Sequence, residues 1–299
     1  MTDTNTAVAA PSATDSTGMG YLNTLPRRVV TVYIPLALFL LVLLFPFYWM
    51  GVTTFKPNDE LYNFKAHNPF WITSPTLANI NKLLFHTDYP AWLWNTMLIA
   101  VSATFLSIFS SVLAAYAIVR LRFKGAQAVG LLIFLAYLVP PSILFIPLAT
   151  MVYGLELYDT PWALILTYPT FLIPFCTWLL MGYFKSIPYE LEECALIDGA
   201  TRLQILWKIT LPLAVPGLIS AGIFAFTLSW NEFIYALAFI SSSEEKTVPV
   251  GVLTQLVEGD VYHWGSLMAG ALLGSLPVAI LYSFFVEHYV SSLTGAVKE

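Results

Sequence analysis

The sequence is poor in charged residues, and this shortage excludes a soluble globular protein. Only 10% of its 299 residues are Asp, Glu, Lys or Arg, whereas 58% are hydrophobic. A soluble domain carries about 25% charged residues. The formal net charge of −5 says little, because in a membrane protein the placement of charges matters more than their sum. The composition predicts a polytopic membrane protein.

Cysteine, histidine and catalytic motifs are also sparse. Cys176 and Cys194 are the two cysteines, and the four histidines show no ligand spacing, so neither a metal site nor a disulfide is expected. The chain has no G-x-x-x-x-G-K-[ST] phosphate loop and no H-E-x-x-H, Cys-x-x-Cys or G-x-S-x-G motif. We therefore expect a non-enzymatic chain without catalytic residues, cofactor, metal or nucleic-acid partner.

Long uncharged runs alternate with short charged segments. Residues 1–25 are rich in Thr, Ser, Ala and Asp without periodicity, which predicts a disordered tail. The uncharged run over 29–50 can span about 30 Å of hydrocarbon, and no small-residue cleavage site follows it. Five more spans are predicted over 92–119, 126–151, 161–184, 213–240 and 267–290. The expected fold is all-α, one membrane domain of six transmembrane helices over 26–299.

The basic residues are distributed unequally between the two sets of connecting segments. One set holds nine, namely Arg27, Arg28, Arg120, Arg122, Lys124, Lys185, Arg202, Lys208 and Lys298, and the other holds four, namely Lys56, Lys65, Lys82 and Lys246. By the positive-inside rule, the first set is cytoplasmic. Both termini and the segment around 185–212 are therefore predicted on the cytoplasmic side.

The segment around 185–212 is too charged for lipid and has the pattern of two short helices. Glu190, Glu192 and Glu193 follow Pro188, as favoured in a first helical turn. Gly199 is a natural terminator.

A second helix is expected to follow at once. Thr201 and Gln204 have capping-box spacing. Apolar residues recur at i, i+3 and i+4 and give each helix one apolar face; these are Leu191, Cys194 and Ala195, then Leu203, Leu206 and Trp207. An exposed helix-turn-helix with such faces predicts a partner.

This segment resembles the EAA motif of permease subunits of binding-protein-dependent ABC importers, with Cys194 in place of the usual first alanine. The resemblance covers roughly residues 25 to 295. Asn95-Thr96, Ala115-Tyr116-Ala117, Arg120-Leu121-Arg122-Phe123 and Trp230-Asn231-Glu232-Phe233 are similar to the carbohydrate-uptake branch, of the maltose-importer type.

The resemblance implies that the segment is a coupling loop that docks on an ATPase. Glu193, Asp198 and Gly199 would shape the loop, and Leu203, Leu206 and Trp207 would fill a groove of the ATPase. Ala195 and Ala200 complete the residues expected to take part in the coupling.

It also implies partners and a location. The partners are a second homologous permease, two ATPase subunits that carry ATP and Mg, an external substrate-binding lipoprotein or periplasmic protein, and membrane lipid. The location is the cytoplasmic (inner) membrane of a bacterium or archaeon.

Polar groups inside the predicted spans are candidates for a substrate path. Thr227, Asn231 and Tyr235 would share one helical face, with Trp230 and Glu232 beside them. An aromatic plane next to amide and hydroxyl groups suits a sugar, but Asn231 and Glu232 could instead bind a neighbouring helix and hold the assembly together. The prolines at 140, 141, 169 and 174 predict bends that either gate a pathway or serve static packing.

Three other functions compete with this interpretation. An importer for another small polar solute, such as glycerol 3-phosphate, fits the same motifs. An ion-driven secondary transporter needs ionisable residues deep in several spans, and only Glu232 approaches this description. A membrane-embedded enzyme lacks a catalytic constellation.

Overall fold

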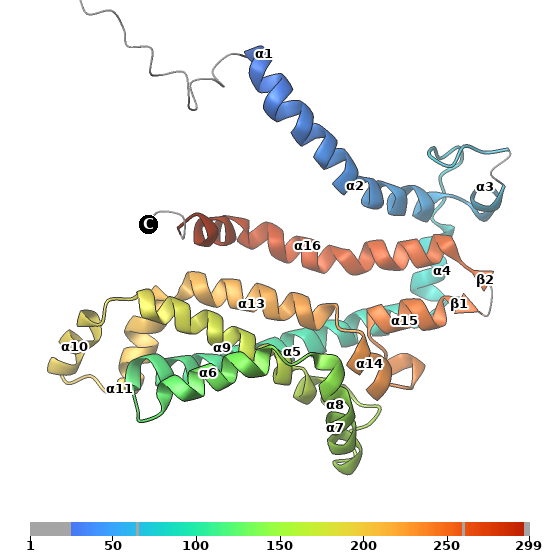
Figure 1. The fold of residues 1–299 in the computed structure, drawn as a ribbon. Coiled ribbons are helices and arrows are strands. Elements are labelled where there is room, and N and C mark those ends of the chain that lie inside the picture. Colours follow the sequence, from blue (N-terminus) through green and yellow to red (C-terminus); the bar gives the residue numbers. More distant parts are fainter. Residues whose placement is uncertain (1–24, 64–65, 259–260, 296–299) are drawn as a thin grey trace, which may run out of the picture.

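The described part of the chain is mostly helical (Figure 1). The computed structural model describes residues 25–63, 66–258 and 261–295, so the predicted tail over 1–25 lies outside the described residues except for Leu25. In chain order the elements are α1 (Leu25–Arg28), η2 (Val29–Tyr33), α2 (Ile34–Phe55), α3 (Asn58–Tyr62), α4 (Ala78–Phe85), α5 (Tyr89–Tyr116), η3 (Ala117–Leu121), α6 (Ala126–Tyr137), α7 (Pro141–Gly154), α8 (Pro161–Thr167), α9 (Pro169–Ser186), α10 (Glu190–Ile197), α11 (Arg202–Ile205), η4 (Leu206–Thr210), α12 (Leu211–Leu213), α13 (Val215–Trp230), α14 (Ile234–Phe239), η5 (Ser243–Glu245), α15 (Val248–Gln255), β1 (Val257–Glu258), β2 (Val261–Tyr262) and α16 (Trp264–Gly295). The all-α class is thus confirmed, apart from the two-residue hairpin β1–β2.

Several helices are long and apolar enough to cross a membrane. Among the described residues these are the stretches Leu25–Phe55, Tyr89–Leu121, Pro161–Ser186 and Trp264–Phe285. Two bent pairs pass the same test: α6 with α7, bent by 97°, and the α11–α12 stretch with α13, bent by 79°. The structure therefore has four such helices, and six if each bent pair is one span.

The bend between α6 and α7 follows from two adjacent prolines. α6 ends at Tyr137, and α7 begins at Pro141 with Pro140 in extended conformation before it. Proline lacks an N–H and fixes its own φ, so it starts a helix more readily than it continues one. The predicted break at Pro140-Pro141 is confirmed. Pro147 and Pro174, in contrast, lie inside continuous helices.

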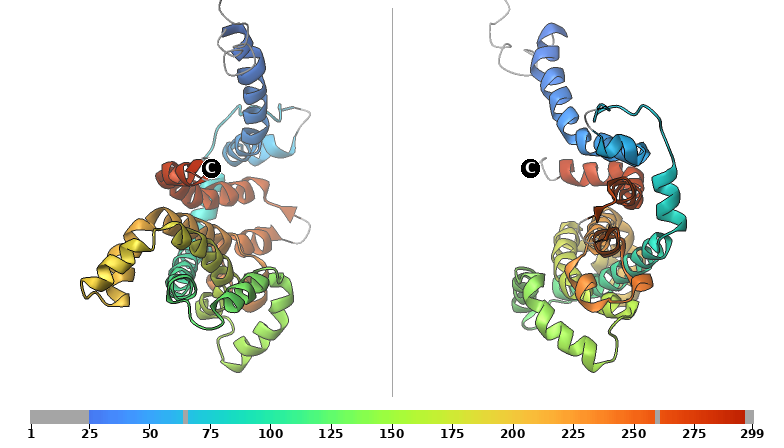
Figure 2. Two further views of the ribbon diagram at one scale, coloured as in Figure 1. Left: turned by 60° about the vertical axis from the view of Figure 1, so that its left-hand side comes forward. Right: turned by 90° about the vertical axis from the view of Figure 1, so that its right-hand side faces the viewer.

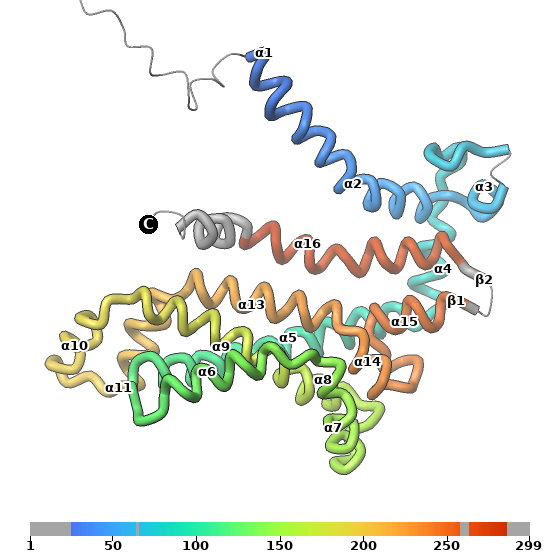
Figure 3. Tube along the Cα trace, in the orientation of Figure 1, coloured from blue at the N-terminus to red at the C-terminus, as the bar shows by residue number. Residues whose placement is uncertain are grey.

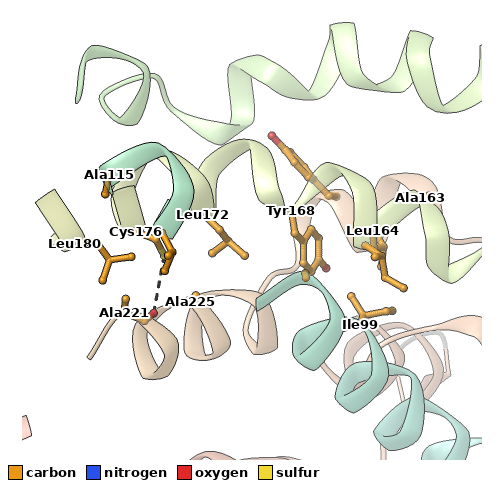
Figure 4. Packing of buried hydrophobic residues seen from close by; sticks show 14 of the residues in the cluster. Ile99, Ala115, Ala163, Leu164, Tyr168, Leu172, Cys176, Leu180, Ala221 and Ala225 are labelled. Carbon is orange, nitrogen blue, oxygen red and sulfur yellow. Dashed lines mark hydrogen bonds between the residues drawn. The ribbon is translucent and has the colours of Figure 1, made fainter. Parts of the chain in front are cut away.

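The main core lies where α5, α9 and α13 pack together. Cys176 and Leu180 of α9 are fully buried beside Ala115 of α5 and Ala221 of α13 (Figure 4). The small side chains allow the three helices to approach closely, and the Cys176 thiol lies 3.9 Å from the carbonyl oxygen of Ala221. The packing at Cys176 is that of an ordinary buried cysteine.

The first helix stands apart from this core. α2 packs on α16 near its C-terminal end but leaves the other helices toward its N-terminus (Figures 1 and 2). Its side chains from Leu25 to Tyr48 are exposed. In a membrane this apolar surface faces lipid or another membrane protein.

The segments at the end opposite α10 are held together by apolar packing and by hydrogen bonds. α4 is a short helix in which Leu83 is buried, with Ile80 and Leu84 packed against the same cluster. The Asp159 carboxylate accepts hydrogen bonds from the amides of Ser241 and Ser242, both at 2.8 Å, and from the Ser242 hydroxyl. These contacts hold the loop before α8 to the loop after α14.

Candidate functional site

Two short helices, α10 and α11, project from one end of the bundle (Figure 3). We call residues 187–212 the elbow. The chain turns between the helices at Gly199, whose φ of 84° lies in the left-handed region that favours glycine. The amide of Gly199 donates to Leu196, and the amide of Ala200 donates to Ala195. These are the two bonds of a Schellman motif, and the predicted helix end at Gly199 is confirmed.

The second helix of the elbow begins with the predicted capping box. The Thr201 hydroxyl accepts from the amide of Gln204, and the Gln204 side chain accepts from the amide of Thr201. Both bonds satisfy amides that would otherwise lack a partner at the helix start. The turn therefore has a defined shape that local sequence alone specifies.

A buried ion pair anchors the elbow to the bundle. Nε of Arg120, in the last turn after α5, lies 3.2 Å from Oε1 of Glu192, and the two side chains are 4% and 0% exposed. Nη2 of Arg120 also donates to the carbonyl oxygens of Phe184 and Ile187, and the Thr210 hydroxyl donates to Glu192 Oε1 at 3.1 Å. One arginine thus ties together the end of α5, the end of α9 and the elbow.

A second charge and an aromatic ring reinforce this anchor. Nη1 of Arg202 lies 3.8 Å from Oε2 of Glu192. The guanidinium groups of Arg120 and Arg122 lie 5.8 and 5.0 Å from the centre of the Tyr189 ring, within the range of cation–π attraction. Because each buried charge has an opposite charge nearby, the anchor avoids the large cost of an isolated buried ion.

The elbow exposes apolar as well as charged side chains. The exposed apolar ones are Leu191, Ile197, Leu203 and Trp207, with Ile197 85% exposed, and Cys194 is exposed as well. Glu193, Asp198 and Gly199, which were predicted to shape the turn, are exposed, and the other two predicted coupling residues, Ala195 and Ala200, are half-buried.

One residue predicted on the exposed apolar face of the second elbow helix lies in the core. Leu206 is only 1% exposed and belongs to the main core, so the prediction that it fills a partner's groove is wrong. Leu203 and Trp207 share a face because they are four residues apart, whereas Leu206 points with Ile205 toward the bundle. Sequence reasoning also missed Glu192, whose burial depends on a contact with Arg120 far away in the chain.

The predicted substrate face is interrupted in the structure. α13 ends at Trp230, and α14 begins at Ile234, so Thr227, Asn231 and Tyr235 do not lie on one helix, and that prediction is wrong. Tyr235 is fully buried, and its hydroxyl donates to the carbonyl of Pro141 at 2.9 Å. Trp230 is also buried, with Nε1 donating to Gly274 at 3.0 Å.

The break after Trp230 depends on Glu232. Its carboxylate accepts from the amides of Tyr235 at 2.9 Å and Ala236 at 3.1 Å. These amides belong to the first turn of α14, where a carboxylate is favoured by the helix dipole. Glu232 therefore caps α14 within its own chain segment, which accounts for a carboxylate among apolar helices.

Cavities lie on both sides of Asn231. One, of about 570 Å³, is lined by Tyr137, Ser142, Thr170, Phe171 and Phe224 as well as Asn231 and Glu232. The other, of about 710 Å³, includes Phe47, Tyr282 and Ser275. The Asn231 amide donates to the Thr227 carbonyl, and the Thr227 hydroxyl lies 3.4 Å from the Tyr282 hydroxyl. Aromatic rings with hydroxyl and amide groups suit a sugar.

Comparisons with known proteins all point to membrane components of transport systems. The profile of the family "binding-protein-dependent transport system inner membrane component" matches residues 107–295. The chain is 39% identical to the sulfoquinovosyl glycerol transport system permease protein SmoH of Agrobacterium fabrum, over 85% of this chain and 89% of that protein. It is 34% identical to the trehalose/maltose transport system permease protein MalG of Thermococcus litoralis, over 91% and 97%.

A solved structure has the same fold. It is the crystal structure of a bacterial ABC transporter that imports the acidic polysaccharide alginate, which matches with a TM-score of 0.75 at 20% identity. The match covers 88% of this chain and 98% of that one.

Proposed function

Because this chain belongs to the family of inner membrane components of binding-protein-dependent transport systems, we propose that its elbow couples a separate ATPase to the movement of a sugar. The chain is a permease subunit of a sugar ABC importer, a non-enzymatic component of the transporter. The observation that carries the coupling role is the elbow itself, which exposes apolar side chains and is fixed to the ends of α5 and α9 through Arg120 and its partner Glu192.

The geometry explains how force could enter the bundle. An ATPase that grips Ile197, Leu203 and Trp207 would pull on a turn whose shape is fixed by two caps. The displacement would pass through Glu192 and Arg120 to the ends of α5 and α9, which belong to the core. ATP binding would close the ATPase dimer and rotate the core helices, and hydrolysis would reset them. Access would then alternate between the two sides of the membrane.

The charge distribution supports the orientation that this mechanism needs. The segments on the elbow's side carry nine of the 13 Lys and Arg residues, which the positive-inside rule assigns to the cytoplasm. We propose six spans, with each bent pair counted as one, and both termini in the cytoplasm. The elbow then lies on the side where ATP is available.

The substrate path is proposed through the cavities beside Asn231. The aromatic and polar residues of the cavities support a polar, ring-shaped solute. The relatives are named for different sugars, so the comparisons select no single one. A second homologous permease would complete the path, and an external binding protein would deliver the solute. Asn231 and the aromatic residues around it are the proposed contacts, whereas Trp230, Glu232 and Tyr235 hold the local structure. A small polar solute of another kind, such as glycerol 3-phosphate, is the second candidate.

Reconstitution tests this proposal. The chain is assembled with its partner permease, ATPase and binding protein in proteoliposomes, and uptake of labelled sugars is measured with and without internal ATP. We expect uptake only when ATP and the binding protein are both present. Uptake by this chain alone, driven by a proton or sodium gradient, would show a secondary transporter instead.

A further inference from the structure

A large cavity lies beside the elbow and outside the proposed sugar path. It has a volume of about 1460 Å³ and is formed between α6, the end of α5 and the end of α9. Leu131, Phe134, Trp178 and Met181 form an apolar wall along α6 and α9. Leu131 and Trp178 are 58% and 49% exposed, so apolar surface is open to the surroundings here.

Basic side chains stand at the elbow end of the same cavity. Arg122 and Lys185 line it and are exposed, and Arg120, which also lines it, is buried. Arg120 is paired with Glu192. Arg122 rests on the Tyr189 ring, and within the described part of the chain no ion pair joins Arg122 or Lys185 to a carboxylate. Glu190 is the one acidic side chain among the lining residues, so the lining carries more positive than negative charges.

The apolar wall and the basic residues together suit an amphipathic ligand. Lys185 lies in the last turn of α9, and Arg122 follows directly after the helical stretch that ends at Leu121. Both therefore lie where helices long enough to cross the membrane come to an end. A ligand here would place a negative headgroup against the two basic residues and a hydrocarbon chain along Trp178 and Phe134.

We propose that this cavity binds an anionic phospholipid of the cytoplasmic leaflet. Basic pockets between transmembrane helices on the cytoplasmic side bind such headgroups, and each Lys or Arg near an anionic surface strengthens binding about fivefold. The inference rests on the proposed orientation in the membrane and is independent of the sugar carried. Because Arg120 lines the cavity and also anchors the elbow, a bound lipid would brace the joint through which the ATPase acts.

Trp178 provides a direct probe of occupancy. The assembled importer is placed in phosphatidylcholine vesicles that contain brominated phosphatidylglycerol or, in a parallel set, brominated phosphatidylcholine. Bromine quenches tryptophan fluorescence on contact, and subtracting the Trp178→Phe protein isolates the signal of this residue. We expect quenching by the anionic lipid to exceed that by the neutral lipid at equal content.

Charge variants decide whether the site is specific. The double variant Arg122→Gln/Lys185→Gln should need about 25-fold more brominated phosphatidylglycerol for the same excess quenching. The variant Arg27→Gln/Arg28→Gln, which removes two exposed charges outside the cavity and the elbow, and the charge-preserving Arg122→Lys/Lys185→Arg should behave like the parent. A sizing column confirms assembly of each protein. Equal quenching by both lipids, or an unchanged response of the Gln double variant, would overturn the proposal. So would displacement of the lipid by glycerol phosphate alone, because the site would then take a soluble anion.

Discussion

Arg120 and Glu192 meet in a buried ion pair, with 3.2 Å between Nε and Oε1. The arginine belongs to the end of the α5 stretch, and the glutamate belongs to the first turn of α10. Between them they join the elbow to the helices of the core. The pair is the mechanical link of the proposed mechanism, and it explains why an elbow that projects from the bundle has one fully buried carboxylate.

Replacing Glu192 with Gln should destabilise the protein and uncouple transport. Removal of one partner leaves Arg120 buried without its counter-charge, which should lower the free energy of unfolding by about 3 kcal/mol. The neighbouring Glu193 is exposed, so Glu193→Gln is a matched control with little effect on stability. Thermal unfolding followed on a sizing column measures both. Equal stability of the two variants would contradict the role of the pair.

Replacing Gly199 with Val should reduce the stimulation of the ATPase by the loaded binding protein. A β-carbon at Gly199 would meet no atom within 4 Å, so the effect comes from the backbone. A side chain other than glycine costs roughly 1–2 kcal/mol in the left-handed region, and a β-branched one resists it further. Gly199→Asn, which tolerates this region, should retain most of the stimulation. Stimulation in the Val variant equal to that of the parent would sink the coupling role of the turn.

Replacing Asn231 with Ala should lower sugar uptake while the complex still assembles. Loss of one hydrogen bond to the sugar corresponds to roughly a 2- to 10-fold decrease in uptake at low sugar concentration. Ser220→Ala is the control, because Ser220 lies on α13, the helix that ends directly before Asn231, and its hydroxyl donates to the Pro216 carbonyl in the same helix. If the Asn231 variant fails to assemble, the residue is structural, and the path lies elsewhere.

The contribution of the Asp159 hydrogen bonds to the stability of the fold should fall at acidic pH. Burial raises the pKa of Asp159, but the hydroxyl of Ser242 and the amides of Ser242 and Ser241 outweigh this effect, and the pKa lies below its usual value of 3.8. A carboxyl group with a lowered pKa stabilises the fold above its unfolded pKa and loses this contribution as the pH falls through its folded pKa. The difference in unfolding temperature between the parent and Asp159→Asn should be full at neutral pH and shrink as the pH falls below 3.8, toward the lowered pKa of the folded protein. A difference that stays constant over this range would exclude the titration of Asp159.

Local features of the elbow could be predicted from the sequence, and long-range ones could not. The Gly199 turn and the Thr201–Gln204 box depend on residues within a few positions of one another, so their spacing is sufficient. Glu190, Glu192 and Glu193 look alike in the sequence. Only the position of Arg120 at the end of another helix selects Glu192 for burial. The sequence offers one weak signal for the burial of Glu192: Ala195, an apolar residue three positions later, lies on the same side of the helix.

The interrupted helix after Trp230 had no marker of the kind that revealed the break at Pro140. Residues 231–233 are Asn, Glu and Phe, none of which prevents a helix. The helix stops because the Glu232 carboxylate competes for the amides of the next turn and because Trp230 and Tyr235 are each fixed by a buried hydrogen bond to another helix. Tertiary contacts thus overrode the local pattern that placed Thr227, Asn231 and Tyr235 on one face.

The native cysteines allow a probe to be attached to the elbow without introducing a new residue. Cys194 is exposed on α10, whereas Cys176 is buried in the core, so a maleimide that carries a photoreactive benzophenone should label Cys194 alone, and Cys194→Ala serves as the unlabelled control. After illumination of the assembled importer in membrane vesicles, the account predicts a cross-link between this chain and the ATPase. A cross-link to lipid only, or labelling of Cys194 by an impermeant maleimide from the external side, would contradict it.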